Sequence, residues 1–327
     1  MLKPYGTALG AGVTSAVLIA VATTHTLAGL VLAQLAPLPI MIVGLSFPPP
    51  VGAAAALIGA GAIALSSGPL SGLLFLVFST LPAWLLARLA VRHGMSAPAA
   101  GAPGSAPAGV PETSWTPVST LALALVAASC VPVLLAGAAL IWRFGGYGHA
   151  LARASRAVSK VLDGTPLPGD IAVDTVVQIA PVAMAVTGVL VLGINLWLAA
   201  RSTQLSGWLA RPWPNLPDGL RLPRAAVGAF VVVGTAVLLP DPFGLAATVA
   251  AGALGMAFAF EGLAAVHVLT RRLPARAALL AGVYLAILAV EPWPLLALVL
   301  AGCIDCLVPQ VRRGAAIKIT KLPNRRQ

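Results

Sequence analysis

Long apolar runs without a charged residue follow one another along almost the whole chain. A helix needs about 20 apolar residues to cross the roughly 30 Å of hydrocarbon in a bilayer, and about 17 is the lower limit. Only 9% of the 327 residues are charged, against about 25% in ordinary soluble domains. Because so few polar side chains cannot cover a water-soluble fold, and apolar residues reach 59%, both a soluble enzyme and disorder are excluded. The sequence predicts an all-α, polytopic transmembrane helical bundle.

The apolar runs give ten candidate spans, several of them near the lower length limit. They are Thr7–Thr23, Thr26–Ser46, Pro50–Ser66, Leu70–Leu89, Pro117–Trp142, Ile171–Ala200, Ala225–Leu239, Phe243–Thr270, Ala275–Val290 and Pro294–Val308. Eight spans with re-entrant or surface pieces are the alternative. The first run lacks a polar cleavage region, so we expect a retained helix and not a removed signal peptide.

The basic residues favour one orientation of these spans. With a cytoplasmic N-terminus, sixteen Lys and Arg residues fall on the inner side and four on the outer side. Cytoplasmic loops are the loops enriched in Lys and Arg. We therefore expect a multi-pass protein of the bacterial inner (plasma) membrane with both termini in the cytoplasm. The net charge of +11 then indicates membrane anchoring, and no nucleic-acid partner is expected.

The four outer basic residues belong to one long connection, and three of them share a helical face. Arg153, Arg156 and Lys160 lie on one side of a helix predicted at 149–162, while Leu151, Ser155, Val158 and Leu162 recur on another. This pattern is typical of a basic amphipathic helix in the headgroup layer. A solvated loop helix is the alternative.

Composition divides the chain into blocks. A four-span block (1–90) precedes a Pro/Ala/Gly-rich linker (91–116), and a six-span block (117–311) precedes a basic tail (312–327). Within the second block, residues 201–224 carry four prolines together with Trp208 and Trp213. Because proline stiffens the backbone and tryptophan favours the interface, we expect a rigid strap against the inner leaflet. A partner-docking loop is the alternative.

Small residues recur at four-residue intervals in the first span, at Ala8, Gly12, Ala16 and Ala20. Such faces let helix backbones approach closely in lipid. Packing within the same chain is the simplest interpretation, and a docking face for a separate subunit is the alternative.

A few polar residues fall inside the apolar runs, where an ionisable group costs several kcal/mol. Glu261 stands ten residues before Arg271, about 15 Å of helix rise, which predicts a place near the midplane. Asp305, the pair Asp174 and Gln178 at four-residue spacing, and Gln34 complete the candidates for a substrate or proton path. Internal pairing of these groups is the alternative.

Prolines beside two of these candidates predict broken helices. Pro37 and Pro39 follow Gln34, and Pro181 follows Gln178. Proline frees backbone carbonyl groups, which at membrane depth are tolerated where they line a cavity or are buried in protein. The sequence leaves open whether each site is a cavity or a packed kink.

Motifs for catalysis or cofactors are missing from the sequence. Cys303 and Cys306 have CxxC spacing but no accompanying histidine cluster, so structural thiols are expected and no metal. The sequence has no phosphate-binding Walker motif, no GxSxG and no HExxH. We expect no catalytic residues, no cofactor and no ATP hydrolysis by the chain itself.

Four stretches resemble the YybS-like family of bacterial integral membrane proteins. They are LAPLPIMIVGL at 35–45, NLWLAARSTQLSGWLARPWPNL at 195–216, EGLAAVH at 261–267 and GCIDCLVPQVRRG at 302–314. That family is distantly similar to the substrate-binding S components of energy-coupling-factor transporters, which meet a transmembrane coupling subunit through small residues of their first helix. The resemblance implies such a contact at Ala8, Gly12, Ala16 and Ala20.

Three functions remain as hypotheses. The first is a small-molecule transporter or substrate-binding transport component, with Glu261, Asp305, Asp174, Gln178 and Gln34 along its path. The second is a membrane scaffold or assembly factor that docks a partner through Trp208 and Trp213. The third is a lipid-modifying membrane enzyme. The expected partners are the lipid bilayer and a transmembrane coupling subunit or another membrane protein.

Overall fold

The computed structural model describes residues 2–24, 26–95, 113–162, 172–209, 211–290 and 292–308. Most of the predicted linker and the whole basic tail (312–327) lie outside these residues. The regular secondary structure of the described chain is helical except for two three-residue strands, β1 (His93–Met95) and β2 (Thr113–Trp115). They pair antiparallel at the two ends of the linker, with Gly94 opposite Ser114.

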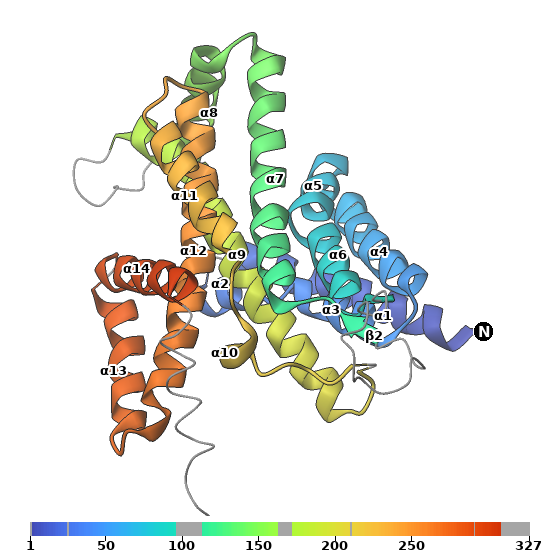
Figure 1. The fold of residues 1–327 in the computed structure, drawn as a ribbon. Coiled ribbons are helices and arrows are strands. Elements are labelled where there is room, and N and C mark those ends of the chain that lie inside the picture. Colours follow the sequence, from blue (N-terminus) through green and yellow to red (C-terminus); the bar gives the residue numbers. More distant parts are fainter. Residues whose placement is uncertain are drawn as a thin grey trace, which may run out of the picture. The chain divides into compact units, whose positions relative to one another are not determined.

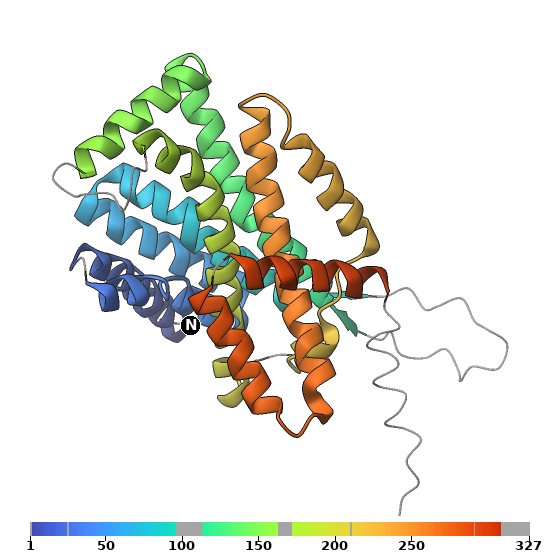
Figure 2. The ribbon, with the colours of Figure 1, turned by 90° about the vertical axis from the view of Figure 1, so that its left-hand side faces the viewer.

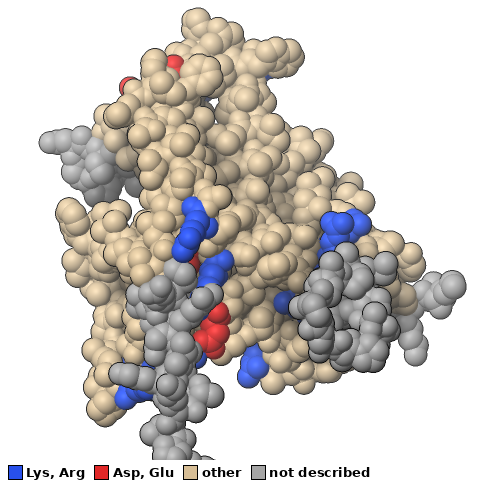
Figure 3. Space-filling view, viewed as in Figure 1, with Lys and Arg blue, Asp and Glu red and all other residues tan. Residues whose placement is uncertain are grey.

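All ten predicted apolar segments are helical in the structure. Seven helical stretches of the described residues are long and apolar enough to cross a membrane: Pro4–Thr24, Leu27–Ser46, Pro49–Ser67, Pro69–Ala90, Val118–Phe144, Val173–Leu205 and Phe243–Arg272. The other three, Arg224–Ala236, Arg276–Ala289 and Trp293–Leu307, are shorter. Most of the surface visible in Figure 3 carries neither basic nor acidic residues. The prediction of an all-α bundle in a multi-pass membrane protein is confirmed.

The described chain forms two compact units, residues 1–125 with 191–214, and residues 126–190 with 215–327. The first contains α1 (Leu2–Ala20), η1 (Val21–Thr24), α2 (Leu27–Ala33), α3 (Pro37–Ser46), α4 (Pro49–Ser67), α5 (Pro69–Phe75), η2 (Leu76–Thr80), α6 (Leu81–Ala90) and the two strands. The second contains α8 (Tyr147–Leu162), α10 (Leu216–Gly219), α11 (Arg224–Ala236), α12 (Phe243–Leu269), η3 (Thr270–Arg272), α13 (Arg276–Ala289) and α14 (Trp293–Leu307). The long helices α7 (Val118–Phe144) and α9 (Val173–Leu205) belong partly to each. This division follows spatial contacts, whereas the four-span and six-span blocks remain a prediction from composition.

In the first unit, small residues allow α1 to lie directly on α4. A Cβ atom at Gly12 would come within 2.7 Å of the Ala55 carbonyl oxygen and 2.9 Å of the Gly59 nitrogen. Ala8 and Ala16 on the same face are buried. Helices α4, α5 and α6 lie beside one another in this unit (Figure 1). Helices α1 and α4 are therefore held at this contact by close backbone approach.

In the second unit, two glycines allow α14 to cross α12 (Figure 2). A Cβ atom at Gly262 would overlap the Leu298 carbonyl oxygen, and one at Gly302 would overlap the Phe258 carbonyl oxygen. Phe258, next to this crossing, is completely buried. The two backbones are thus in contact, and no larger residue fits at either glycine without moving a helix.

The two predicted proline breaks have different outcomes. Helix α2 ends at Ala33 and α3 begins at Pro37, so the break beside Gln34 is confirmed. The predicted break at Pro181 is wrong, because α9 continues through it without interruption. One proline removes a single N–H donor, and its fixed φ is compatible with a helix; neighbouring groups can then tolerate the lost bond. Two prolines spaced by one residue remove two donors from the same turn.

Candidate functional site

The Glu261 carboxyl group lies inside the second unit and is the most deeply buried of the predicted path residues. Its side chain is 0% exposed, although it belongs to α12, a helix long enough to cross a membrane. Oε2 accepts a hydrogen bond of 3.1 Å from the backbone N–H of Leu222. A non-helical segment therefore reaches a carboxyl group within an apolar helix.

The segment that reaches Glu261 is the second half of the predicted strap, and an ion pair fixes its direction. Asp218 in α10 accepts from Arg271 at 2.8 and 2.9 Å in a two-pronged pair, and Asn215 also donates to Asp218 at 2.6 Å. Arg271 and Glu261 are about 15 Å apart along η3 and α12, and Asp218 and Leu222, which bind them, are at most about 14 Å apart along the chain. Residues 218–222 thus run beside the last turns of α12.

Helix α14 contributes a second acidic residue and a thiol to the same region. Cys306 donates from Sγ to the Leu222 carbonyl oxygen at 3.2 Å, so Glu261 and Cys306 together bind both backbone polar groups of Leu222. Asp305, the residue before Cys306 in α14, is only 5% exposed. Two of the sequence-predicted path residues, Glu261 and Asp305, are therefore buried on two helices that cross.

Carboxyl groups and thiols are the reactive side chains of this region. In the described residues, no three His, Cys, Asp or Glu side chains form a group suited to a metal ion. Cys303 and Cys306 are free thiols, and the bond from Cys306 to Leu222 gives this thiol a structural contact. A carboxyl group that exchanges a proton or binds a cation is the reactive element that these residues offer.

Gln34 has a structural role that depends on its backbone carbonyl and not on its side chain. The side chain is exposed, whereas the backbone carbonyl accepts from Asn195 Nδ2 at 2.9 Å. This carbonyl is left available because Leu38, which would bond to it in a helix, donates instead to Leu35. Ser15 similarly donates to the Ala36 carbonyl at 2.5 Å. The break between α2 and α3 is a packed kink whose carbonyl groups are bound by side chains.

Asp174 and Gln178 lie in the first turns of α9, and both side chains are exposed. Asp174 Oδ1 accepts from Ser155 of α8 at 2.5 Å. An acidic residue in the first turn also matches the positive end of the helix dipole. These observations give Asp174 a role in joining α8 to α9.

The small-residue face of the first helix is occupied by the chain itself. Gly12 lies against the α4 backbone and Ala8 and Ala16 are buried, while Ala20 is exposed. The face that the S-component resemblance would assign to a coupling subunit is thus largely covered by α4. This arrangement agrees with the simpler of the two interpretations, packing within the chain.

The first half of the strap is attached to its unit by a buried arginine. Arg211 is 6% exposed and donates from Nη1 to the carbonyl oxygens of Ala90 at 2.7 Å and Thr116 at 3.2 Å. Its guanidinium carbon lies 5.7 Å from the Trp115 ring centroid and 5.6 Å from that of Trp213. Burial lowers the pKa of Arg211 from its usual range. Arg211 therefore joins the strap to both ends of the linker.

The two strap tryptophans differ in environment. Trp213 packs on Arg211 and is partly buried. Trp208 is 57% exposed and makes an edge contact with Phe47, with ring centroids 5.5 Å apart. Of the two residues predicted to dock a partner, only Trp208 presents most of its surface.

Reasoning from the sequence missed Leu222, Arg211 and the glycine pair at 262 and 302. Leu222 contributes only backbone atoms, so its identity carries no signal. Arg211 directly precedes Pro212 and has Trp208 and Trp213 on its two sides in the sequence, and these tryptophans were the one available hint of a buried cation. Neither Gly262 nor Gly302 has a Gly, Ala or Ser four residues away, so the two become recognisable only when α12 and α14 are seen to cross.

Comparison with known proteins adds no relative: no family model, no curated protein and no solved structure matches the chain. Inference of function therefore depends on the chain's own residues.

Proposed function

We propose that the protein is a membrane transport protein, acting as a small-molecule transporter or as the substrate-binding component of one, with Glu261 as its ion-handling carboxyl group and Asp305 beside the same path. The observation that carries this proposal is the complete burial of Glu261 in a membrane-length helix, with a loop backbone bonded to it. The bacterial inner membrane is its proposed location.

The energetic cost of the arrangement supports a functional role. A carboxyl group in a membrane-spanning helix costs several kcal/mol and is therefore rare unless it serves an ion or substrate path. Irregular backbone at membrane depth is tolerated only where it is buried in protein or lines a cavity. At Glu261 a carboxyl group in a membrane-length helix meets the irregular backbone of Leu222. Non-helical backbone beside an ionisable group is typical of the ion and substrate sites of secondary transporters.

Energy for transport must enter through an ion gradient or a separate subunit, because the sequence contains no Walker motif for ATP hydrolysis. Proton exchange at Glu261 would couple a gradient to substrate movement. A transmembrane coupling subunit is the alternative energy source, and its contact surface would differ from the Gly12 face that α4 covers.

A transport assay in proteoliposomes tests the proposal, with a cell extract as the source of candidate solutes. Vesicles containing the wild-type protein are incubated in a small-molecule cell extract with an imposed proton gradient, washed, and analysed by mass spectrometry. We expect one or more solutes to accumulate in wild-type vesicles and to fall to the level of protein-free vesicles with Glu261→Gln, which keeps the shape of the side chain.

Asp174→Asn is the matched control, because it also neutralises one acidic group but at an exposed side chain bonded to Ser155. Its vesicles should accumulate the same solutes as wild type. The proposal would be refuted if Glu261→Gln vesicles still accumulated the solutes. It would also be refuted if wild-type vesicles never accumulated more than protein-free vesicles, with either a gradient or a coupling partner supplied.

A scaffold function is the second candidate, and the exposed Trp208 is the observation that favours it. A photoreactive amino acid at position 208 would crosslink a specific membrane or cytoplasmic protein in cells. The same group at position 213, which packs on Arg211, is the internal control. Crosslinks equally frequent at both positions, or at neither, would exclude this function for the strap.

A further inference from the structure

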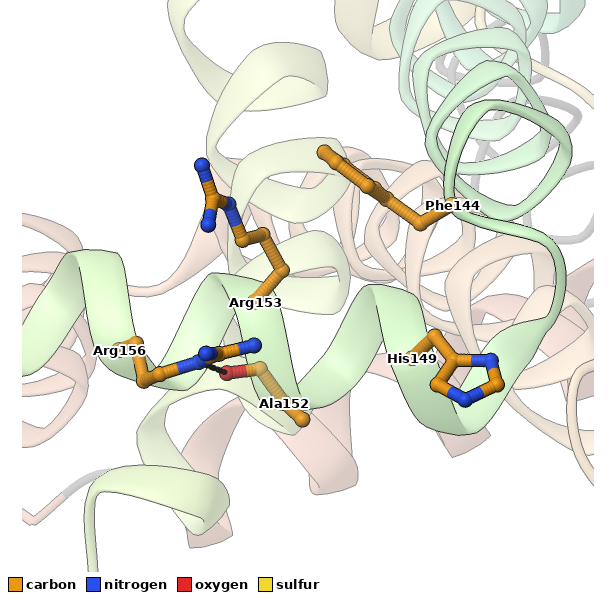
Figure 4. A pocket seen from close by; sticks show the side chains of 5 residues that line it. All are labelled: Phe144, His149, Ala152, Arg153 and Arg156. Carbon is orange, nitrogen blue, oxygen red and sulfur yellow. Dashed lines mark hydrogen bonds between the residues drawn. The ribbon is translucent and has the colours of Figure 1, made fainter.

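An open pocket of about 300 Å³ lies where α7 meets α8, and basic residues line it. Its lining residues are Phe144, His149, Ala152, Arg153 and Arg156. The last four are spaced i, i+3, i+4 and i+7 along α8, so they form one stripe of the helix. Figure 4 shows Phe144 extending from the end of α7 toward Arg153, with the Arg156 guanidinium beside Ala152.

A glycine turn places α8 against the end of α7. Gly145 and Gly146 have φ values of 73° and 141°, which other residues adopt only with strain. Gly146 donates to the Ile141 carbonyl at 2.9 Å, and Ala150 then donates to Gly146 at 3.0 Å. The turn therefore ends one helix and begins the next within two residues, so that the basic stripe of α8 and Phe144 line the same pocket.

The positive charges of the pocket are available to a ligand. In the described part of the chain, neither Arg153 nor Arg156 makes an ion pair, and the bond that Arg156 makes is from Nε to the Ala152 carbonyl of its own helix. A third cation, Arg143, has its guanidinium carbon 5.9 Å from the Phe144 ring centroid. None of the five lining residues is acidic. Such a pocket favours an anion.

The aromatic residues next to the pocket indicate the level of the lipid headgroups. Trp142, at the end of membrane-length α7, is 85% exposed, and tryptophan at the end of a span is typical of the membrane–water interface. Helix α8 exposes Arg153, Arg156 and Lys160, whereas residues 150, 151, 154 and 158 are partly buried. This is the pattern of a helix that lies along an interface.

We propose that the α7–α8 pocket binds the phosphoryl group of an anionic ligand, with the guanidinium groups of Arg153 and Arg156 as its charged contacts. Arginine forms two parallel hydrogen bonds with phosphate oxygens, which gives both affinity and orientation. The volume admits a phosphoryl group with a small substituent. A phospholipid headgroup and a soluble phosphate compound share this chemistry, and the two sources are distinguished by experiment.

Native mass spectrometry of the full-length protein in neutral detergent tests the lipid source, with phosphatidylglycerol and phosphatidylcholine added separately. Isothermal titration with inorganic phosphate and glycerol 3-phosphate, without lipid, tests the soluble source. Retention of phosphatidylglycerol alone identifies a lipid site, and saturable heat with a phosphate compound identifies a soluble ligand. Either result supports a phosphoryl site, and binding of neither would overturn it.

Two substitutions on the same helix form the matched pair. Arg156→Gln removes a pocket cation, and Lys160→Gln removes an equal charge one turn away, outside the pocket lining. Losing one charge-assisted contact should weaken binding about tenfold for Arg156→Gln, with less than about a twofold change for Lys160→Gln. Equal losses would mean attraction to the overall charge and would refute a defined site.

Arg156→Lys separates geometry from charge and serves if Arg156→Gln lowers the yield of folded protein. It keeps the positive charge but loses the planar fork, so we expect it to bind several-fold more weakly than wild type. Binding by Arg156→Lys and Arg153→Lys that equals wild type would contradict the two-pronged contact that defines the proposal.

Discussion

The two units differ in the kind of buried side chain that binds irregular backbone. In the first unit the buried groups are donors, and they bind backbone carbonyls: Arg211 those of Ala90 and Thr116, and Asn195 that of Gln34. In the second unit a buried acceptor, Glu261, binds the N–H of Leu222, and the Cys306 thiol beside it donates to the Leu222 carbonyl. Both arrangements attach a non-helical segment to helices.

The buried groups of the two units differ in whether they can change their protonation state. Asparagine does not titrate and arginine stays charged at any physiological pH, so the first unit's contacts hold one chemical state. A carboxyl group can take up and release a proton. We therefore interpret the first unit's buried polar groups as stabilising and the second unit's as functional, and the following changes test that division.

The largest effect is expected at the glycine crossing that supports the Glu261 region. Gly302→Val would place side-chain atoms against the Phe258 carbonyl and should lower the free energy of unfolding by about 3 kcal/mol or more. Gly282→Val in α13 is the control, because a Cβ atom at Gly282 meets nothing within 4 Å. Thermal unfolding in detergent compares the two. Similar unfolding temperatures would mean that α12 and α14 do not cross at these glycines.

The next effect is expected at the buried guanidinium of the first unit. Arg211→Met keeps the apolar stem but removes the bonds to Ala90 and Thr116, and should cost about 2–3 kcal/mol of unfolding free energy. Arg88→Met removes an exposed arginine that lies 5.7 Å from the Trp84 ring and should cost less than about 1 kcal/mol. If transport by Arg211→Met vesicles were lost while stability was unchanged, the stabilising role would be wrong.

A smaller effect is expected at the proline kink. Asn195→Ala removes the donors to the Gln34 and Val191 carbonyls and should cost about 1–2 kcal/mol. Gln34→Ala should leave stability and transport unchanged, because the contact uses only the backbone of Gln34. A transport defect in Gln34→Ala with normal unfolding would restore Gln34 to the substrate path.

The smallest effect concerns alkaline pH and Tyr147 in the second unit. Burial, and secondarily Asp241, raises the pKa of Tyr147. The stability due to this residue is fully present below the unfolded pKa of about 10 and is lost as pH rises through the higher folded value. Unfolding temperatures from neutral pH upward should fall slightly less steeply for Tyr147→Phe than for wild type. A steeper fall in Tyr147→Phe would contradict the sign.

Much of the fold was predictable because the bilayer imposes it. Uncharged runs have to be helical in lipid, so the ten segments could be located from the sequence, and the two prolines at 37 and 39 marked a true break. Pro181 misled because a single proline is tolerated inside a long helix. The midplane position expected for Glu261 remains a prediction. The structure adds that Glu261 is bonded to Leu222 of the strap.

The candidate site was predictable only as a set of unusual residues. Glu261 and Asp305 stood out because carboxyl groups are expensive in apolar helices. Their environment depends on Leu222, which is 39 residues from Glu261 and participates through backbone atoms. No side-chain pattern encodes such a contact. Gln34 was identified for its polar side chain, whereas its carbonyl is the group that the fold uses.

The most direct test of the account is whether Glu261 exchanges a proton in the folded protein. Infrared difference spectra between acidic and alkaline buffer would record the carboxyl band of the protein reconstituted in lipid. We predict a reversible band that disappears in Glu261→Gln and persists in Asp174→Asn. A spectrum that is identical in wild type and Glu261→Gln would show that this carboxyl group keeps one state, and would contradict its role in transport.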